Sequence, residues 1–337
     1  MKLSRDRAWT LLRAFPSRRV TVVGDLMLDR YVQGSVERIS PEAPVPVVHV
    51  RERRAVPGGA SNVAMNLRAL GGRASVCGLL GKDASGEELE ARLRAAGVMC
   101  SGARRPNWPT IVKTRVLADR QQIARVDDEA PIQWKPGELN AFAARAARAA
   151  AAADAVVLED YDKGVVNQRV ASAVLRAARR AGIPSGLDPK NHETLRIRGV
   201  TFATPNRKEA FETAGIRDPG ALPDPLRDPA LLRVGRALLE QWAPRHLAIT
   251  LGSLGMLLLS PGERPRHVPT RAIEVFDVSG AGDTVIAALA LALAAGANFI
   301  EASELANYAA GVVVGKLGTA TCSPEELVEH MRECGAP

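Results

Sequence analysis

The chain has 337 residues, of which 46% are hydrophobic and 24% are charged, and its formal net charge at pH 7 is +8. Such a composition is typical of a globular protein with a large core, and the length allows one to three domains. The first residues are interrupted by charges, and the longest apolar run, 284–299, is short for a membrane helix. We therefore expect neither a signal peptide nor a membrane partner.

The positive charge comes from 37 arginines and 8 lysines that are dispersed along the chain. Only 4% of the residues are aromatic, which leaves few platforms for stacking bases, so we expect no nucleic-acid partner. A phosphorylated small molecule explains a positive site equally well, and a proteome rich in arginine explains the bulk of the charge. The cysteines lack metal-ligand spacing and, without an export signal, indicate reduced thiols in a cytoplasmic protein.

Strand and helix patterns alternate along most of the chain. Short apolar runs predict strands at 18–25, 74–81, 154–160, 182–189, 199–206 and 246–252. Helical spacing or composition predicts helices at 58–72, 85–98 and 141–154. This alternation indicates a mostly parallel sheet with helices on both faces.

Two stretches break the alternation, at about 30–56 and 103–127. Both contain short β-like pieces, and we expect them to pair as a small separate β-sheet, a lid over the binding site. Its apolar face is expected to comprise Val45, Val47, Val48, Val50, Ile111, Val112, Val116 and Leu117. An isolated sheet with an apolar face and open edges is unfavourable in water, so we predict a homodimer through the lid. The alternative is a monomer in which the body itself covers the lid.

The segment "VFDVSGAGDTVIAAL", 275–289, joins an apolar run, predicted as a strand over 272–278, to a long predicted helix. Gly280, Ala281 and Gly282 lie in the turn, where small residues let a ligand approach the free N–H groups of the helix start. Asp283 follows as either a helix N-cap or a general base. Neither a Walker motif nor a GxGxxG after the first strand is present, which weakens P-loop and dinucleotide readings.

Four motifs together resemble those of ribokinase-type carbohydrate kinases, also called the phosphofructokinase B family. They stand in family order at 57–71, 204–209, 250–255 and 277–284. The resemblance implies a three-layer α/β fold with a mostly parallel sheet between helices and a small β-sheet lid. It implies one kinase domain over 1–337, with ATP and Mg²⁺ as cofactors.

Within this family, four further segments are most similar to the heptose 7-phosphate kinase branch. They are "GDLMLDRY", "RISPEAPVPVV", "DYDKG" and "GVVVGKLGTAT". The implied reaction is ATP-dependent phosphorylation of the anomeric hydroxyl of a heptose 7-phosphate, a step of lipopolysaccharide core synthesis. Some relatives carry a fused adenylyltransferase domain, and we expect none here. The alternatives are another sugar-phosphate kinase, such as a fructose-phosphate kinase, and a non-catalytic sugar-phosphate sensor.

The resemblance also implies roles for individual residues. Asp283 matches the catalytic base and Gly280, Ala281 and Gly282 the anion hole for the transferred phosphoryl group. Sugar hydroxyls are expected at Asp29, Gly58, Gly59 and Asn62, whose other reading is a turn carboxylate and a helix start. Asp160 is also expected to bind the sugar. The sugar phosphate is expected among Lys113, Lys163, Arg104, Arg105 and Arg115, with a solvated surface as the alternative for any one arginine.

On the nucleotide side, Lys190 is expected at the ATP phosphates, because it follows a strand end. Asn206 and Glu209 match the segment that organises Mg²⁺, through water; alone, they could be a helix cap and a solvated face. The adenine and ribose are expected at Thr250, Gly252, Gly255 and Asn307, of which Asn307 could equally be a packing residue. The family also admits a monovalent cation near Asp277, Ser279 and 315–319.

Overall fold

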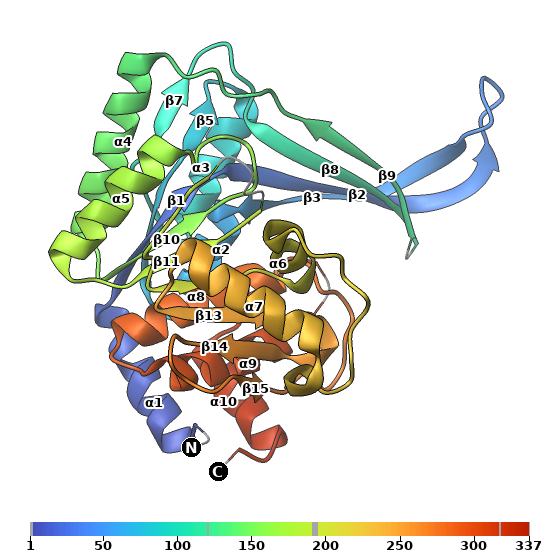
Figure 1. The fold of residues 1–337 in the computed structure, drawn as a ribbon. Coiled ribbons are helices and arrows are strands. Elements are labelled where there is room, and N and C mark those ends of the chain that lie inside the picture. The colour runs from blue at the N-terminus through green and yellow to red at the C-terminus, as the bar shows by residue number, and fades with distance from the viewer. Residues whose placement is uncertain (1–2, 120, 191–194, 317, 337) are drawn as a thin grey trace.

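The computed structural model describes residues 3–119, 121–190, 195–316 and 318–336. They form an α/β body, built on one large sheet, and a smaller sheet that projects from it (Figure 1). The predicted α/β fold with a separate lid sheet is confirmed.

The large sheet has nine strands in the order β15-β14-β13-β12-β11-β10-β1-β4-β6. The strands from β13 to β6 are parallel, whereas β14 and β15 extend one edge in antiparallel fashion. Residues that follow the parallel strands therefore meet at one edge of the sheet. The strands are β1 (Arg19–Gly24), β4 (Arg73–Cys77), β6 (Met99–Cys100), β10 (Ala155–Glu159), β11 (Ser185–Asp188), β12 (Phe202–Ala203), β13 (His246–Thr250), β14 (Met256–Leu259) and β15 (Arg266–Val268).

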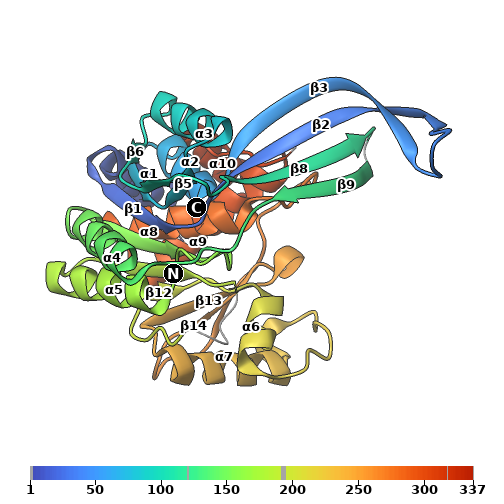
Figure 2. The same cartoon turned by 90° about the horizontal axis from the view of Figure 1, so that it is seen from above.

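Helices cover both faces of this sheet (Figure 2). Strand β10 shows why, because its side chains alternate: Ala155 and Val157 join one core, and Val156 and Leu158 join the other. The first core is completed by α1 (Arg5–Ala14), α2 (Ala60–Ala69), α3 (Ala84–Ala95), α8 (Ala281–Ala294), α9 (Phe299–Val314) and α10 (Pro324–Glu333). The second contains α4 (Pro136–Ala151), α5 (Gln168–Ala181), α6 (Arg207–Ala214) and α7 (Pro229–Trp242).

The apolar run 284–299 lies mostly in helix α8, which is buried from Asp283 to Ala292. No helix in the described part of the chain is both long and apolar enough to cross a membrane. The strand predicted over 272–278 is wrong, because this segment is irregular. The N–H groups of Phe276 and Asp277 both donate to the carbonyl of Val314, so the end of α9 takes the place of a neighbouring strand.

The lid sheet has the strand order β3-β2-β8-β9. Strands β2 (Leu26–Ile39) and β3 (Pro46–Gly59) form a long antiparallel hairpin whose tip projects away from the body (Figure 1). Strand β8 (Ile111–Ala118) runs parallel to β2, and β9 (Gln121–Asp128) runs antiparallel to β8. The lid thus begins later in its second segment than predicted, since β7 (Ala103–Arg105) pairs instead with β5 (Leu79–Gly81).

The expected apolar face of the lid is wrong in composition. Neighbouring residues of a strand point to opposite faces, so Val116 and Leu117 cannot share one, and Val45 precedes β3. Val112 is almost fully buried in the core of the body. The inner face of the lid, which carries Asp29, is mostly polar, and the outer face carries residues such as Val32, Val116 and Val126.

Candidate active site

Asp283 lies in the first turn of α8, directly behind three small residues. The N-cap is Gly280, whose φ of 80° favours a residue without a Cβ. Asp283 Oδ2 accepts a hydrogen bond from Asn62 Nδ2 at 2.5 Å, and its Oδ1 accepts one from the Tyr161 hydroxyl at 2.9 Å. The reading of Asp283 as the helix N-cap is therefore wrong.

Burial is the main influence on the Asp283 carboxyl, which is only 5% exposed. It raises the pKa of Asp283 to about 6. The hydrogen bonds from Asn62 and Tyr161 and the charge of Lys190 oppose this rise in pKa, and the carboxylate of Asp29 adds to it. At pH 7 such a group is mostly ionised and more basic than an ordinary aspartate, as a general base requires.

The start of α8 leaves room for an anion. The N–H groups of Gly282 and Asp283 have no partner within the helix and lie at the positive end of its dipole. A Cβ at Gly280 would come within 2.8 Å of Asn62 Nδ2. A side chain at this position would therefore push on the amide that donates to Asp283. A Cβ at Gly282 would have its nearest neighbour, Asp188 Oδ2, at 3.9 Å. The start of α8 is thus open on the side that faces Asp188.

The residues predicted for the sugar gather where the lid joins the body. Gly58, the last residue but one of β3, lies close to the Asp29 carboxylate, and Gly59, with a φ of 54°, is the N-cap of α2. Asn62 belongs to the first turn of that helix and reaches the base directly. Asp29 is nearly buried, and its Oδ1 accepts a hydrogen bond from Arg115 Nη1 at 2.6 Å. The lid and the body therefore both contribute residues to this group.

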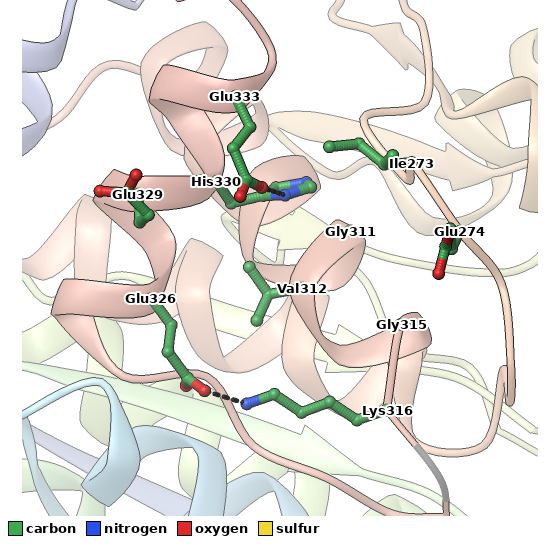
Figure 3. A pocket seen from close by; sticks show the side chains of 10 residues that line it. All are labelled: Ile273, Glu274, Gly311, Val312, Gly315, Lys316, Glu326, Glu329, His330 and Glu333. Carbon is green, nitrogen blue, oxygen red and sulfur yellow. Dashed lines mark hydrogen bonds and ion pairs between the residues drawn. The ribbon is translucent and has the colours of Figure 1, made fainter.

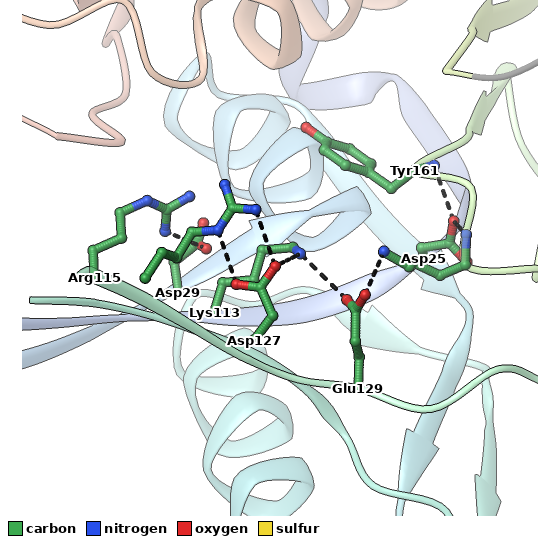
Figure 4. A network of polar contacts seen from close by, with 9 residues as sticks. Asp25, Asp29, Lys113, Arg115, Asp127, Glu129 and Tyr161 are labelled. Atoms are coloured by element: carbon green, nitrogen blue, oxygen red, sulfur yellow. Dashed lines mark hydrogen bonds and ion pairs between the residues drawn. The ribbon is translucent and has the colours of Figure 1, made fainter.

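Asp25, which directly follows β1, holds the loop after β10 in place. Its carboxylate accepts hydrogen bonds from the N–H groups of Tyr161, Lys163 and Val165 at 2.9, 3.2 and 3.1 Å (Figure 4). Burial raises the pKa of Asp25, and these three hydrogen bonds oppose the rise. The sequence analysis missed Asp25 and Tyr161, although a carboxylate at the end of the first buried strand was a usable signal.

The two lysines predicted for the sugar phosphate lie on either side of Glu129. Lys113 Nζ lies 3.1 Å from Asp127 Oδ2 and 3.3 Å from Glu129 Oε2. Lys163 Nζ lies 2.7 Å from the other oxygen of Glu129. Figure 4 shows this row of charges running along the lid from Arg115 to Glu129. The structure therefore brings both lysines into one group of charges around Glu129.

Arg104 and Arg105 do not join the residues around Glu129. Both lie on β7, where Arg104 pairs with Glu90 of α3. Arg105 Nη2 lies 2.6 Å from Glu138 Oε2 at the start of α4. Their guanidinium groups thus join elements of the body to each other.

The residues predicted for the adenine and ribose lie at the end of β13, in the turn after it and on helix α9. The N–H of Thr250 donates to the carbonyl of Pro205 at 2.9 Å, and Gly252 and Gly255 both have positive φ. Apart from the two neighbouring residues, no heavy atom of the described residues lies within 4 Å of a Cβ placed at Gly252, so the turn is open there. Asn307 is buried, and its Nδ2 donates to the carbonyl of Pro269 at 2.6 Å. Its side chain therefore fixes the segment after β15.

Asn206 and Glu209 form a capping box at the start of α6. Asn206 Oδ1 accepts from the N–H of Glu209 at 3.0 Å, and Glu209 Oε2 accepts from the N–H of Asn206 at 2.9 Å. The reading of Asn206 as a helix cap is correct, but Glu209 is buried and does not belong to a solvated face. Lys190 Nζ lies 3.4 Å from Glu209 Oε1, so its ammonium group stands beside this cluster.

Three carboxylates could together hold a cation. Glu159, Asp188 and Asp283 each offer an oxygen, and these oxygens lie within 4.8 Å of one another. Neither oxygen of the fully buried Glu159 has a donor in the described part of the chain. Burial and the neighbouring carboxylates raise the pKa of Glu159 and of Asp188 well above their ordinary values. Oxygen ligands of this kind suit Mg²⁺, so the residues present fit the ion that a kinase uses.

Asp160, which was expected at the sugar, follows Glu159 and is also buried. Burial raises its pKa to about 7. Its Oδ1 accepts from the N–H of Asp162 at 2.9 Å. The sequence analysis missed Glu159 and Asp188, because a buried strand end shows nothing of which other strand ends it will meet.

The loop before the anion hole is held by Asp277. Its oxygens accept from the N–H groups of Ser279 and Gly318 at 2.9 and 3.0 Å. These hydrogen bonds lower the pKa of Asp277 despite partial burial, which opposes them. The predicted cation region thus has a carboxylate at its centre, and residue 317 lies outside the described residues.

A separate hollow of about 630 Å³ lies between residues 273–274, the second half of α9 and α10 (Figure 3). Its charged lining includes Glu274, Glu329 and Glu333, and the Lys316–Glu326 ion pair stands at one end. None of the residues predicted for the sugar, the ATP phosphates or the adenine lines it.

Comparison with known proteins decides the family. Residues 17–326 match the model of the pfkB family of carbohydrate kinases. The chain belongs to the pfkB family. This pfkB kinase is 46% identical over 323 residues to the bifunctional protein HldE of Alkalilimnicola ehrlichii, which covers 96% of this chain and 65% of that protein. It is 43% identical over 320 residues to the bifunctional protein HldE of Vibrio parahaemolyticus, and this match covers 95% of this chain and 64% of that protein. The chain thus spans less than two-thirds of the length of these curated relatives.

Solved structures show the same ribokinase-like fold. Phosphofructokinase-2 from Escherichia coli in complex with potassium has a TM-score of 0.76 at 20% identity, covering 94% of this chain and 99% of that one. Ribokinase of Arabidopsis thaliana, complexed with ribose and ATP, has a TM-score of 0.71 at 22% identity, with the same coverage. The protein is therefore a carbohydrate kinase of ribokinase-like fold.

Proposed function

We propose that this pfkB kinase transfers the γ-phosphoryl group of ATP to the anomeric hydroxyl of D-glycero-β-D-manno-heptose 7-phosphate. The product would be the 1,7-bisphosphate, an intermediate toward ADP-heptose and the lipopolysaccharide core, made in the cytoplasm. The identity to HldE proteins over nearly the whole chain supports the choice of substrate. The observation that carries the chemistry is the buried base Asp283 at an open helix start, in contact with Asn62.

In the proposed reaction, Asp283 accepts the proton of the anomeric hydroxyl while that oxygen bonds to the γ-phosphorus. The bond between the γ-phosphorus and its bridging oxygen breaks, and ADP leaves with the electron pair. N–H groups at the start of α8 donate to the phosphoryl oxygens. Asn62 and Tyr161 hold the carboxylate in place. Glu159 and Asp188 would hold Mg²⁺, directly or through water, and the ion would neutralise phosphate charge.

The remaining contacts are proposed from their places around this centre. Lys190 would meet the ATP phosphates, because it stands beside Glu209 and its charge acts on Asp283. The open turn at Gly252 would admit the nucleoside. Asp29 would bind a sugar hydroxyl, and Lys163 the far end of the sugar.

A substrate panel tests the proposed function. Heptose 7-phosphate, fructose 6-phosphate, fructose 1-phosphate and ribose are each supplied with ATP and Mg²⁺, and ADP release is measured. We expect the highest kcat/KM for heptose 7-phosphate, and phosphorus NMR of the product should show the new ester at the anomeric carbon. Turnover of fructose 6-phosphate without turnover of the heptose would overturn the proposal, and tight binding without any turnover would indicate a sensor.

We also propose that the protein is a homodimer joined through the outer face of the lid. All residues of β9 are exposed, and Val126 on this strand is 59% exposed. Val126→Asp should give a monomer in light scattering at micromolar concentration. Val275→Asp is the matched control, because Val275 is 61% exposed but belongs to the body. A monomeric wild type, or a V126D dimer, would show that the lid is not the interface.

The loop that carries Asp277 is the proposed place for a monovalent cation. Its carboxylate is kept ionised by two backbone N–H groups, and a solved relative was crystallised in complex with potassium. Activity in potassium chloride compared with choline chloride at equal ionic strength tests this. Equal rates in the two salts would rule out a required cation.

A further inference from the structure

A row of basic side chains crosses the inner face of the lid. The strand register places Tyr31 opposite Arg54 on one side and Arg115 on the other, and Arg115 opposite Arg125. Directly paired residues share a face of a sheet, so these four side chains lie on the face that also carries Asp29. Two of the three guanidinium groups, those of Arg54 and Arg115, thus lie against one aromatic ring, and that of Arg125 follows on the next strand.

This arrangement is unfavourable without a negatively charged partner. Arg115 and Arg125 are directly opposite, and like charges in that position destabilise a sheet. Arg115 is partly balanced by Asp29 at 2.6 Å, and Arg125 by Asp127 at 2.9 Å. The charge of Asp127 also acts on Arg115, but neither carboxylate forms an ion pair with Arg54.

Arg54 is the member whose charge is not balanced. It is half-buried, and in the described part of the chain its guanidinium makes neither a hydrogen bond nor an ion pair. Its Cζ lies 4.5 Å from the centre of the Tyr31 ring, and that of Arg115 lies 5.5 Å from it. Stacking on one ring holds both groups in place before any ligand arrives.

The row also faces the reacting end of the site. A side chain at Gly318 would collide with the Arg54 guanidinium, and the N–H of Gly318 binds Asp277. The next residue, Thr319, lies against the position of a Cβ at Gly280, in the anion hole. Arg54 therefore extends from the lid to the loop beside the start of α8.

We propose that Arg54, Arg115 and Arg125 form a binding site for a phosphate group that a substrate carries into the cleft. Guanidinium groups match the oxygens of a phosphate in pairs, and several on one face supply more positive charge than their carboxylates remove. The two lysines nearby are a weaker candidate, because Glu129 lies between them and pairs with both. The phosphate belongs either to the sugar, a source that rests on the proposed function, or to ATP.

Two variants and a matched control test the site. Arg54→Gln and Arg125→Gln remove single guanidinium groups, whereas Arg115 is left intact because it also holds Asp29. Arg53→Gln is the control: Arg53 is exposed and pairs with Val32 on the opposite face of the same sheet. Thermal unfolding of each variant shows that the fold is kept. The KM values for sugar and for ATP, and kcat, are measured with the best substrate that the wild type uses.

We expect Arg54→Gln to raise the KM for a sugar phosphate by about 10- to 100-fold, the usual effect of one charge-assisted contact, with the KM for ATP unchanged. Arg125→Gln should act in the same direction, and Arg53→Gln should leave all constants within about twofold. A rise in the KM for ATP or a fall in kcat, with the sugar KM unchanged, would support the site and identify ATP as the source.

The proposal is overturned if the KM values and kcat of both variants stay within twofold of those of the wild type. It is also overturned if Arg53→Gln changes these constants as much as Arg54→Gln does. Failure of the proposed function is recognised separately, because it appears in the wild type as no turnover of heptose 7-phosphate. In that case inorganic phosphate is the probe: it should stabilise the wild type against heat more than Arg54→Gln. Equal stabilisation of the two proteins would again overturn the site.

Discussion

The body and the lid place their charged residues in opposite ways. In the body, Asp25, Glu159, Asp188 and Asp283 are buried or nearly so at the carboxyl ends of strands or at a helix start, and burial raises the pKa of each. In the lid, charges such as those of Arg125 and Asp127 lie on one face of a thin sheet and keep contact with water. Burial can tune proton transfer, while a solvated charged face can recognise a ligand. We therefore expect body substitutions to change rate and stability, and lid substitutions to change affinity.

The largest effect is expected at the base in the body. Asp283→Asn should keep the fold and ATP binding but lower kcat by roughly 10²- to 10⁴-fold, the usual contribution of a positioned acid or base. Steady-state kinetics and calorimetric titration with ATP measure the two properties. In the wild type, kcat/KM should fall below pH about 6, where Asp283 becomes protonated and cannot accept the hydroxyl proton. Turnover of the variant at the wild-type rate would remove Asp283 from the chemistry.

A pair of isoleucines compares the two regions in stability. Ile286 in α8 is fully buried, and Ile286→Ala should lower the free energy of unfolding by about 2–5 kcal/mol. Ile39 at the end of β2 is 60% exposed, and Ile39→Ala should change it by no more than about 0.5 kcal/mol. Urea denaturation of both variants measures the difference. Similar losses would mean that the side chain of Ile39 is packed in solution.

The anchor of the loop after β10 is expected to have a smaller effect. Asp25→Asn replaces one acceptor oxygen by a donor opposite backbone N–H groups, which should cost about 1–3 kcal/mol of stability. It should also lower kcat several-fold, because the loop positions Tyr161 against the base. The control is Asp128→Asn on the exposed strand β9, which should change neither property. An unchanged D25N enzyme would show that the loop keeps its conformation without this carboxylate.

The smallest expected effect is in the pH dependence of stability. The pKa of Glu159 is raised in the folded protein, so the folded state retains a proton that the unfolded state loses above its pKa of about 4.3. Stability of the wild type should therefore fall as the pH rises above that value, and Glu159→Gln should fall less. Urea midpoints between pH 5 and 8, with chelator present, give the slopes. The control is Glu52→Gln on the lid, whose stability should depend on pH as that of the wild type does. If the stability of Glu159→Gln depended on pH in the same way as that of these two proteins, Glu159 would be ionised in the folded state.

Much of the architecture was predictable because it depends on local pattern. Alternating strand and helix signals predicted the α/β body. The family resemblance placed Asp283 and Asn62, from two of the four motifs, in one site with Asp29 from the segment "GDLMLDRY". The lid was recognised from its lack of helical periodicity, but its faces were not. Bulges and strand register decide which residues share a face, and both depend on partners more than 50 residues away, as between β2 and β8. The strand predicted at 272–278 was wrong for a similar reason, because backbone N–H groups of this segment donate to the end of α9 and not to a neighbouring strand.

The sequence by itself determined the kinase family and singled out one carboxylate, which stands behind three small residues at a helix start. Only the tertiary structure decided how that carboxylate is controlled. Tyr161 reaches Asp283 because Asp25, far away in sequence, holds its loop, and Glu159 meets Asp188 because β10 and β11 are neighbours in the sheet. The physical reason is that the pKa of a buried group depends on every charge and donor packed around it, and those come from elements that only the fold brings together.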